Sequence, residues 1–181
     1  VFRTRIAPVP DEASTSARPA TTVRTNRRTI VGVVAVSATG QLVAVTLYAA
    51  TLSTVGVLAE NAGAWLTVVS AFVIQTFLSV GRFVGGTLCD RWPPVGPGTV
   101  AFIALVIGSF GFGMSSSLVM VISTSALVGL ASGACQSAAL TALMRRARTG
   151  ADTDRASTAW NICFDLGLGL GAFLAGLGLY Q

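Results

Sequence analysis

The sequence predicts an all-α membrane protein, a polytopic bundle of five transmembrane helices. Hydrophobic residues make up 52% of the 181-residue chain and charged residues only 10%. Its mean hydropathy of +0.73 is far above that of a soluble domain of this length. The apolar residues fall in long runs separated by short turns, whereas a β-barrel would need alternating segments of about ten residues.

A basic segment precedes the first apolar run. Residues 1–29 hold six arginines among Pro, Ser, Thr and Ala, with too few apolar residues for a core, so we expect a disordered cytoplasmic segment. No apolar stretch follows its first charges closely enough for a cleavable signal peptide. Because residue 1 is Val rather than Met, we expect a fragment or an alternative start codon.

Five apolar runs follow in order. The first exceeds the roughly 20 residues that cross a bilayer, which implies a tilted or bent helix. The second ends abruptly at Asp90 and Arg91, and Pro93 and Pro94 prevent the helix from continuing. The fourth ends in the arginine cluster at 145–148. The predicted spans are 30–58, 64–89, 99–116, 118–144 and 156–180.

The arginines predict the orientation in the membrane. All twelve basic residues are arginine: six precede the first span, one follows the second and four lie between the fourth and fifth. The other two connections carry none. Since basic residues gather on the cytoplasmic side, we expect a multi-pass plasma-membrane protein with its amino terminus inside and its carboxyl end outside. The same positions explain the sequence pI of about 10.1 without nucleic-acid binding.

The chain lacks histidine, which excludes most zinc, haem and Ser-His or Cys-His chemistry. Cys89, Cys135 and Cys163 lie within apolar runs, where a reduced cysteine behaves as a small hydrophobe. We therefore expect no disulfide, no metal and no cofactor.

Polar residues recur at helical spacing in four of the five runs. Gln75, Ser79, Arg82 and Gly86 share one face of the second, for example. Such stripes either join helices or line a watered cavity, and for the amides both interpretations stay open. The third run has no stripe, as is typical of a helix that faces lipid. The candidate solute-path residues are Gln41, Tyr48, Gln75, Arg82, Gln136, Asn161 and Asp165.

Arg82 and Asp165 are charges inside predicted spans. A charge at membrane depth costs at least about 2.5 kcal/mol and by default marks a pathway or an ion pair. Arg82 precedes Asp90 by about 12 Å of helix, and Asp165 follows Arg155 by about 15 Å. We therefore expect the two charges to lie at similar depth and to pair, unless Arg82 extends to the membrane surface.

The turn after the second run resembles a family signature. Gly86-Thr87-Leu88-Cys89-Asp90-Arg91 is similar to the start of G-x-x-x-D-R-x-G-R-R, the loop signature of major facilitator superfamily transporters. Trp92, Pro93 and Pro94 then depart from it. GLASGACQSAALTALMRR resembles the family's tenth helix and RASTAWNICFDLGLGLGAFLAG its eleventh. The resemblance implies that residues 30–181 are helices seven to eleven, that Gly86, Asp90 and Arg91 form the cytoplasmic loop motif, and that an amino-terminal half is missing.

The function that the resemblance implies is secondary active transport of a small solute by alternating access, with proton-coupled efflux as the form suggested. The expected partners are the solute, protons, the lipid bilayer and the missing half. Two alternatives stay open: a truncated, non-transporting remnant or subunit, and an intramembrane enzyme that uses Asp90 and Asp165. The enzyme is less favoured, because the two aspartates form no paired acidic motif and lie on different helices at different depths.

Overall fold

The chain is a bundle of long antiparallel helices. The computed structural model describes residues 27–147 and 149–179. Within them lie five helices, each long and apolar enough to cross a membrane. They are α1 (Arg27–Ala62), α2 (Ala64–Arg91), α3 (Val95–Gly113), α4 (Leu118–Met144) and α5 (Gly150–Leu179). The protein is therefore an all-α, multi-pass membrane protein, as predicted.

α3 and α5 begin earlier than predicted, α3 at Val95 instead of residue 99 and α5 at Gly150 instead of residue 156. Pro94 caps α3, where the N–H that proline lacks would have had no partner within the helix. At α5 the hydroxyl of Thr149 accepts a hydrogen bond from the Asp152 N–H at 3.2 Å and donates one to the Asp152 carboxylate at 2.8 Å. Because of this cap, the helix begins within the polar stretch before residue 156, which the sequence analysis placed outside the span.

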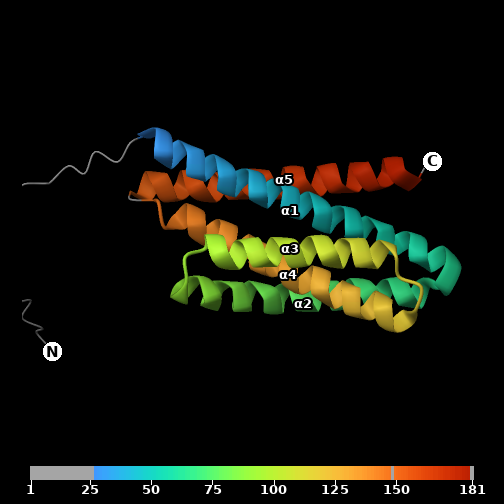
Figure 1. The fold of residues 1–181 in the computed structure, drawn as a ribbon. Coiled ribbons are helices and arrows are strands. Elements are labelled where there is room, and N and C mark those ends of the chain that lie inside the picture. Colours follow the sequence, from blue (N-terminus) through green and yellow to red (C-terminus); the bar gives the residue numbers. More distant parts are fainter. Residues whose placement is uncertain (1–26, 148, 180–181) are drawn as a thin grey trace, which may run out of the picture.

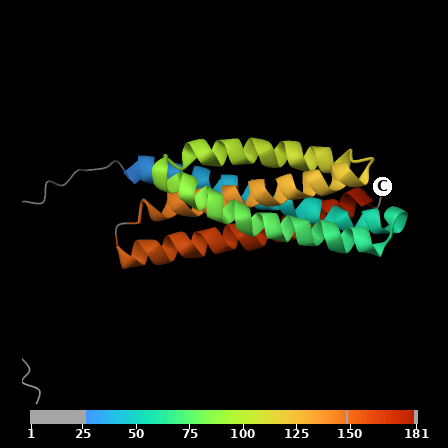
Figure 2. The ribbon, with the colours of Figure 1, turned by 90° about the horizontal axis from the view of Figure 1, so that it is seen from below.

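The helices pack mainly as two pairs, α2 with α4 and α1 with α5. α3 packs chiefly on α4 and lies on the opposite side of the bundle from α5, with the other helices between them (Figures 1 and 2). The outer side chains Ile103, Ile107 and Phe110 of α3 are exposed. The third helix is therefore peripheral, as the lack of a polar stripe predicted.

Glycines bring α2 and α4 into backbone contact. A Cβ on Gly81 would overlap the carbonyl oxygen of Leu130, and one on Gly85 would lie 2.7 Å from the Cα of Ala134. The α4 glycines Gly129 and Gly133 meet the α2 backbone in the same way, at residues 74 and 78. Small residues one turn apart on both helices allow this close approach, as in other membrane helix pairs.

In the second helix pair, α1 with α5, glycines of α5 alone allow the close approach. On α5, a Cβ on Gly167 would lie 2.8 Å from the Cβ of Val45, and a Cβ on Gly171 would overlap the carbonyl oxygen of Thr46. Both contacts are with α1. Gly167 and Gly171 therefore serve the packing of the fifth helix against the first.

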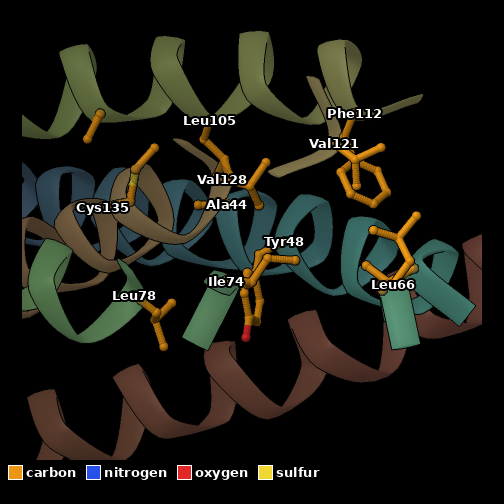
Figure 3. Close-up of a cluster of buried hydrophobic side chains, with 13 residues drawn as sticks. Ala44, Tyr48, Leu66, Ile74, Leu78, Leu105, Phe112, Val121, Val128 and Cys135 are labelled. Atoms are coloured by element: carbon orange, nitrogen blue, oxygen red, sulfur yellow. The ribbon is translucent and has the colours of Figure 1, made fainter. Parts of the chain in front are cut away.

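The apolar core lies among α1, α2, α3 and α4 (Figure 3). Ile74, Leu105 and Val128 are fully buried in it. Tyr48 belongs to this cluster through its ring, but Figure 3 shows its hydroxyl directed away from α3, toward the side on which α5 runs. The core thus carries one polar group to the face of the bundle opposite α3.

The connections that carry arginine lie together at one end of the bundle. The α2–α3 and α4–α5 connections and the start of α1 share this end, while the other two turns lie at the opposite end (Figure 1). We call it the basic end, defined by Arg91, Arg145, Arg146 and Arg155. The fold therefore gathers at one end the arginines that the sequence places on alternate connections.

Candidate solute path

An arginine and an amide meet between α2 and α4. The Nε and Nη2 groups of Arg82 both donate to the side-chain oxygen of Gln136, at 3.2 and 2.6 Å. Gln136 is 1% exposed, and its amide nitrogen donates to the hydroxyl of Ser132 at 3.2 Å. The hydrogen bond to Ser132 fixes the amide group so that its oxygen points at Arg82. The guanidinium is thus held by a neutral partner that is itself fixed.

The backbone of Arg82 is tied to the same helix. Its carbonyl oxygen accepts a hydrogen bond from the hydroxyl of Ser137 at 2.8 Å. Since Ser137 follows Gln136 directly, two neighbouring residues of α4 hold the main chain and the side chain of Arg82. The close backbone contact at Gly81 and Gly133 makes both bonds possible. Arg82 is therefore a positioned charge rather than a freely moving one.

A second polar pair joins α1 to α2. The hydroxyl of Tyr48 donates to the side-chain oxygen of Gln75 at 3.1 Å. Gln75 and Arg82 belong to one stripe of α2, about two turns apart. We call Tyr48, Gln75, Arg82 and Gln136 the polar cluster. The structure thus joins four of the seven candidate path residues as two hydrogen-bonded pairs, from α1, α2 and α4.

The predicted ion pair between Arg82 and Asp165 does not form. Among the described residues the one ion pair joins Arg155 to Asp152, at 3.8 Å. α2 makes no contact with α5, so the helix of Arg82 and the helix of Asp165 are not neighbours. The number of residues from each helix end predicts the depth of Arg82 and Asp165 in the membrane, but it does not predict which helices pack together.

The two candidates on α5 lie apart from the polar cluster. Asp165 and Asn161 are exposed, and the amide of Asn161 donates to the backbone oxygen of Ser157 in its own helix, at 3.0 Å. No hydrogen bond or ion pair links either residue to the cluster within residues 27–147 and 149–179. Their place in a solute path stays a prediction.

Gln41 lies in a different environment. It is 1% exposed, and neither atom of its amide group has a hydrogen-bond partner in the described part of the chain. It lines a cavity of about 250 Å³ between α1, α3 and α4, whose other walls include Phe102 and Cys135. Although Gln41 and Tyr48 share a face of α1, that helix crosses the bundle obliquely, so the two meet different neighbours (Figure 1).

The residues of the predicted loop motif, Gly86, Asp90 and Arg91, lie at the end of α2, which is at the basic end of the bundle. Asp90 and Arg91 are exposed there, in the last turn of the helix. A Cβ on Gly86 would meet open space, so this glycine makes no close helix contact. The contact is made by Gly85 instead. The role of Gly86, Asp90 and Arg91 as a conformational motif stays a prediction.

Sequence reasoning missed a contact beside this motif. The guanidinium of Arg145, just after α4, donates to the carbonyl oxygen of Cys89 in the last turn of α2. A cation is favourable at a helix carboxyl end, where carbonyl groups lack partners within the helix. The arginine cluster after the fourth run was the available signal, but it was interpreted only as a sign of orientation.

The fold and the polar cluster define a class of protein. A bundle of membrane-spanning helices that holds an exposed arginine and several amides within its spans has the construction of a membrane transport protein. The family model described as Major Facilitator Superfamily matches residues 2–172. The chain therefore belongs to the major facilitator superfamily, a family of transporters and not of enzymes. Searches of curated proteins and of solved structures found no match.

Proposed function

We propose that this protein is a secondary active transporter that moves a small solute by alternating access, and that the polar cluster lies on the solute path. The observation that carries the proposal is the pairing of Arg82 with Gln136 between two membrane-spanning helices. A charge there is costly unless water, a ligand or a partner compensates it. A protein keeps such a group when its function needs it.

The surface of α2 supports a path on one side of this helix. Phe72 and Phe83 are 71% and 74% exposed, as suits a helix that contacts lipid or another apolar surface. Gln75, Ser79 and Arg82 are also exposed, on the stripe between those aromatic residues and the α4 contact. Hydrocarbon would not solvate that stripe, so a watered cavity beside α4 fits it better.

The basic end is proposed to be cytoplasmic and the membrane to be the plasma membrane. Arg91, Arg145, Arg146 and Arg155 support the orientation, because short cytoplasmic connections are enriched in arginine and lysine. The amino-terminal segment would then be inside, and the α1–α2 and α3–α4 turns outside.

Proton-coupled efflux is the proposed form of transport. Asp165 is the acid that supports it, because it lies within a membrane-spanning helix, is exposed, and forms no ion pair in the part of the chain that the structure describes. A carboxyl group in this setting can gain and lose a proton as the site alternates between the two sides. The expected effect of Asp165→Asn is loss of proton dependence with solute binding retained.

The experiment that tests the proposal is solute movement in cells that express the full-length gene. A panel of anionic, neutral and cationic solutes is followed with and without a proton gradient. We expect gradient-dependent movement of at least one solute, and its loss in Arg82→Gln. Phe83→Leu is the matched control, because Phe83 is the next residue of α2 and is exposed. Equal movement in the wild type and in cells without the gene, with the protein present in the membrane, would contradict transport.

A further inference from the structure

The polar cluster also indicates what kind of solute binds. We propose that the transported solute is a small organic anion, with a carboxylate or phosphate group that binds the guanidinium of Arg82. This inference rests on the proposed function. It goes beyond that function because membership of the family does not fix the charge of the solute.

The first step is the set of donors that Arg82 has left. A guanidinium carries five N–H groups and no acceptor. Two of them, on Nε and Nη2, bond to Gln136, which leaves three. The planar fork of N–H groups matches the oxygens of a carboxylate or phosphate. Arg82 can therefore hold an anion while Gln136 keeps it in place.

The second step is the charge balance. Gln136, which holds the guanidinium, is neutral, and so is Ser137, whose hydroxyl donates to the Arg82 carbonyl oxygen. Among the described residues no carboxylate lies within 4 Å of its guanidinium, since the one ion pair is at Arg155. No fixed carboxylate in the described part of the chain therefore balances the positive charge of Arg82, so this charge is available to a mobile anion. An anionic solute would supply the missing charge, and would be attracted most strongly where water is excluded.

The third step is a second donor on the same stripe. Gln75 accepts the Tyr48 hydrogen bond through its oxygen, so its amide nitrogen is directed away from that bond and makes no hydrogen bond among the described residues. Gln75 is exposed and lies about two turns from Arg82. A cation and an amide donor about two turns apart suit an organic anion, which has a body long enough to reach both, better than a small inorganic one.

The test uses matched solutes that differ in charge. Benzoate, phenyl phosphate, succinate and glycerol phosphate are compared with benzamide, benzylamine, succinamide and glycerol, and with inorganic phosphate. Transport is followed in proteoliposomes that contain the purified full-length protein. We expect movement of at least one organic anion and of none of its neutral or cationic counterparts. The carboxylates and phosphates separate the two anion chemistries from each other.

Two variants separate charge from folding. Arg82→Gln should lower anion movement at least tenfold, while Arg82→Lys, which keeps the charge but not the fork, should retain part of it. In the wild type, the transported anion should also raise the melting temperature, and its neutral counterpart should not.

Movement of a neutral or cationic solute at a rate that Arg82→Gln leaves unchanged would overturn the anion proposal and leave the transporter proposal intact. Movement of inorganic phosphate in preference to every organic anion would overturn the organic class. If no solute of any charge moves through folded protein, the proposed function fails and the anion proposal fails with it.

Discussion

Arg82 of α2 donates two hydrogen bonds to a single acceptor, the side-chain oxygen of Gln136 on α4, at 3.2 and 2.6 Å. A neutral amide can orient a guanidinium without cancelling its charge, whereas a carboxylate would do both. The choice of glutamine at this position therefore leaves the site positive.

Replacing the Gln136 amide by a carboxylate should prevent anion binding at Arg82. In Gln136→Glu the new carboxylate pairs with Arg82 in place of the solute, so anion uptake should fall at least tenfold while the melting temperature is unchanged or raised. Uptake and thermal unfolding of the same preparation measure this. Gln136→Leu, which removes the amide without adding a charge, is the comparison and should retain more uptake than Gln136→Glu. Wild-type uptake in Gln136→Glu would count against a positive site.

Much of the fold could be predicted because the bilayer restricts it. Apolar runs must be long enough to cross, and charged connections must stay outside, so five helices and a basic end followed from composition and spacing. The contacts between helices could not be predicted in the same way. Periodicity shows which face of a helix is polar, but the glycine contacts at Gly81 and Gly133 decide which helix that face meets. For that reason Arg82 meets Gln136 rather than Asp165, and Gln41 lies apart from Tyr48.

The α2–α4 contact should tolerate no added side chain. Gly133→Ala places a methyl group against the carbonyl oxygen of Leu78 and should destabilise the protein by about 1–3 kcal/mol. Gly86→Ala is the matched control, since its Cβ meets open space on the same helix pair, and it should leave stability unchanged or slightly raised. Thermal unfolding in detergent compares the two variants. Equal melting temperatures would contradict the close backbone contact.

The unpaired amide of Gln41 should cost stability. Both of its polar atoms are buried without a partner in the described part of the chain, so Gln41→Leu, of similar size and apolar, should raise the melting temperature, by an amount that corresponds to about 1–3 kcal/mol. Uptake should be unchanged, because no hydrogen bond joins Gln41 to the polar cluster in the part of the chain that the structure describes. If uptake is lost while the melting temperature is unchanged, Gln41 belongs to the solute path after all.

Labelling with an impermeant thiol reagent checks the orientation. In a background where Cys89, Cys135 and Cys163 are replaced, a cysteine at Ser116, in the α3–α4 turn, should react in intact cells. A cysteine at Thr149, at the basic end, should react only after the cells are opened. The opposite pattern would reverse the proposed topology.

The most direct test of the polar cluster as a solute site is a double-mutant cycle on uptake. Arg82→Gln and Gln136→Leu are measured singly and together, with the amount of folded protein held equal. If the amide acts by holding the guanidinium, removing it has little further effect once Arg82 is gone, so the double variant should be no slower than Arg82→Gln alone. Strictly additive losses, or wild-type uptake in Arg82→Gln, would contradict the assignment of the solute site to this pair.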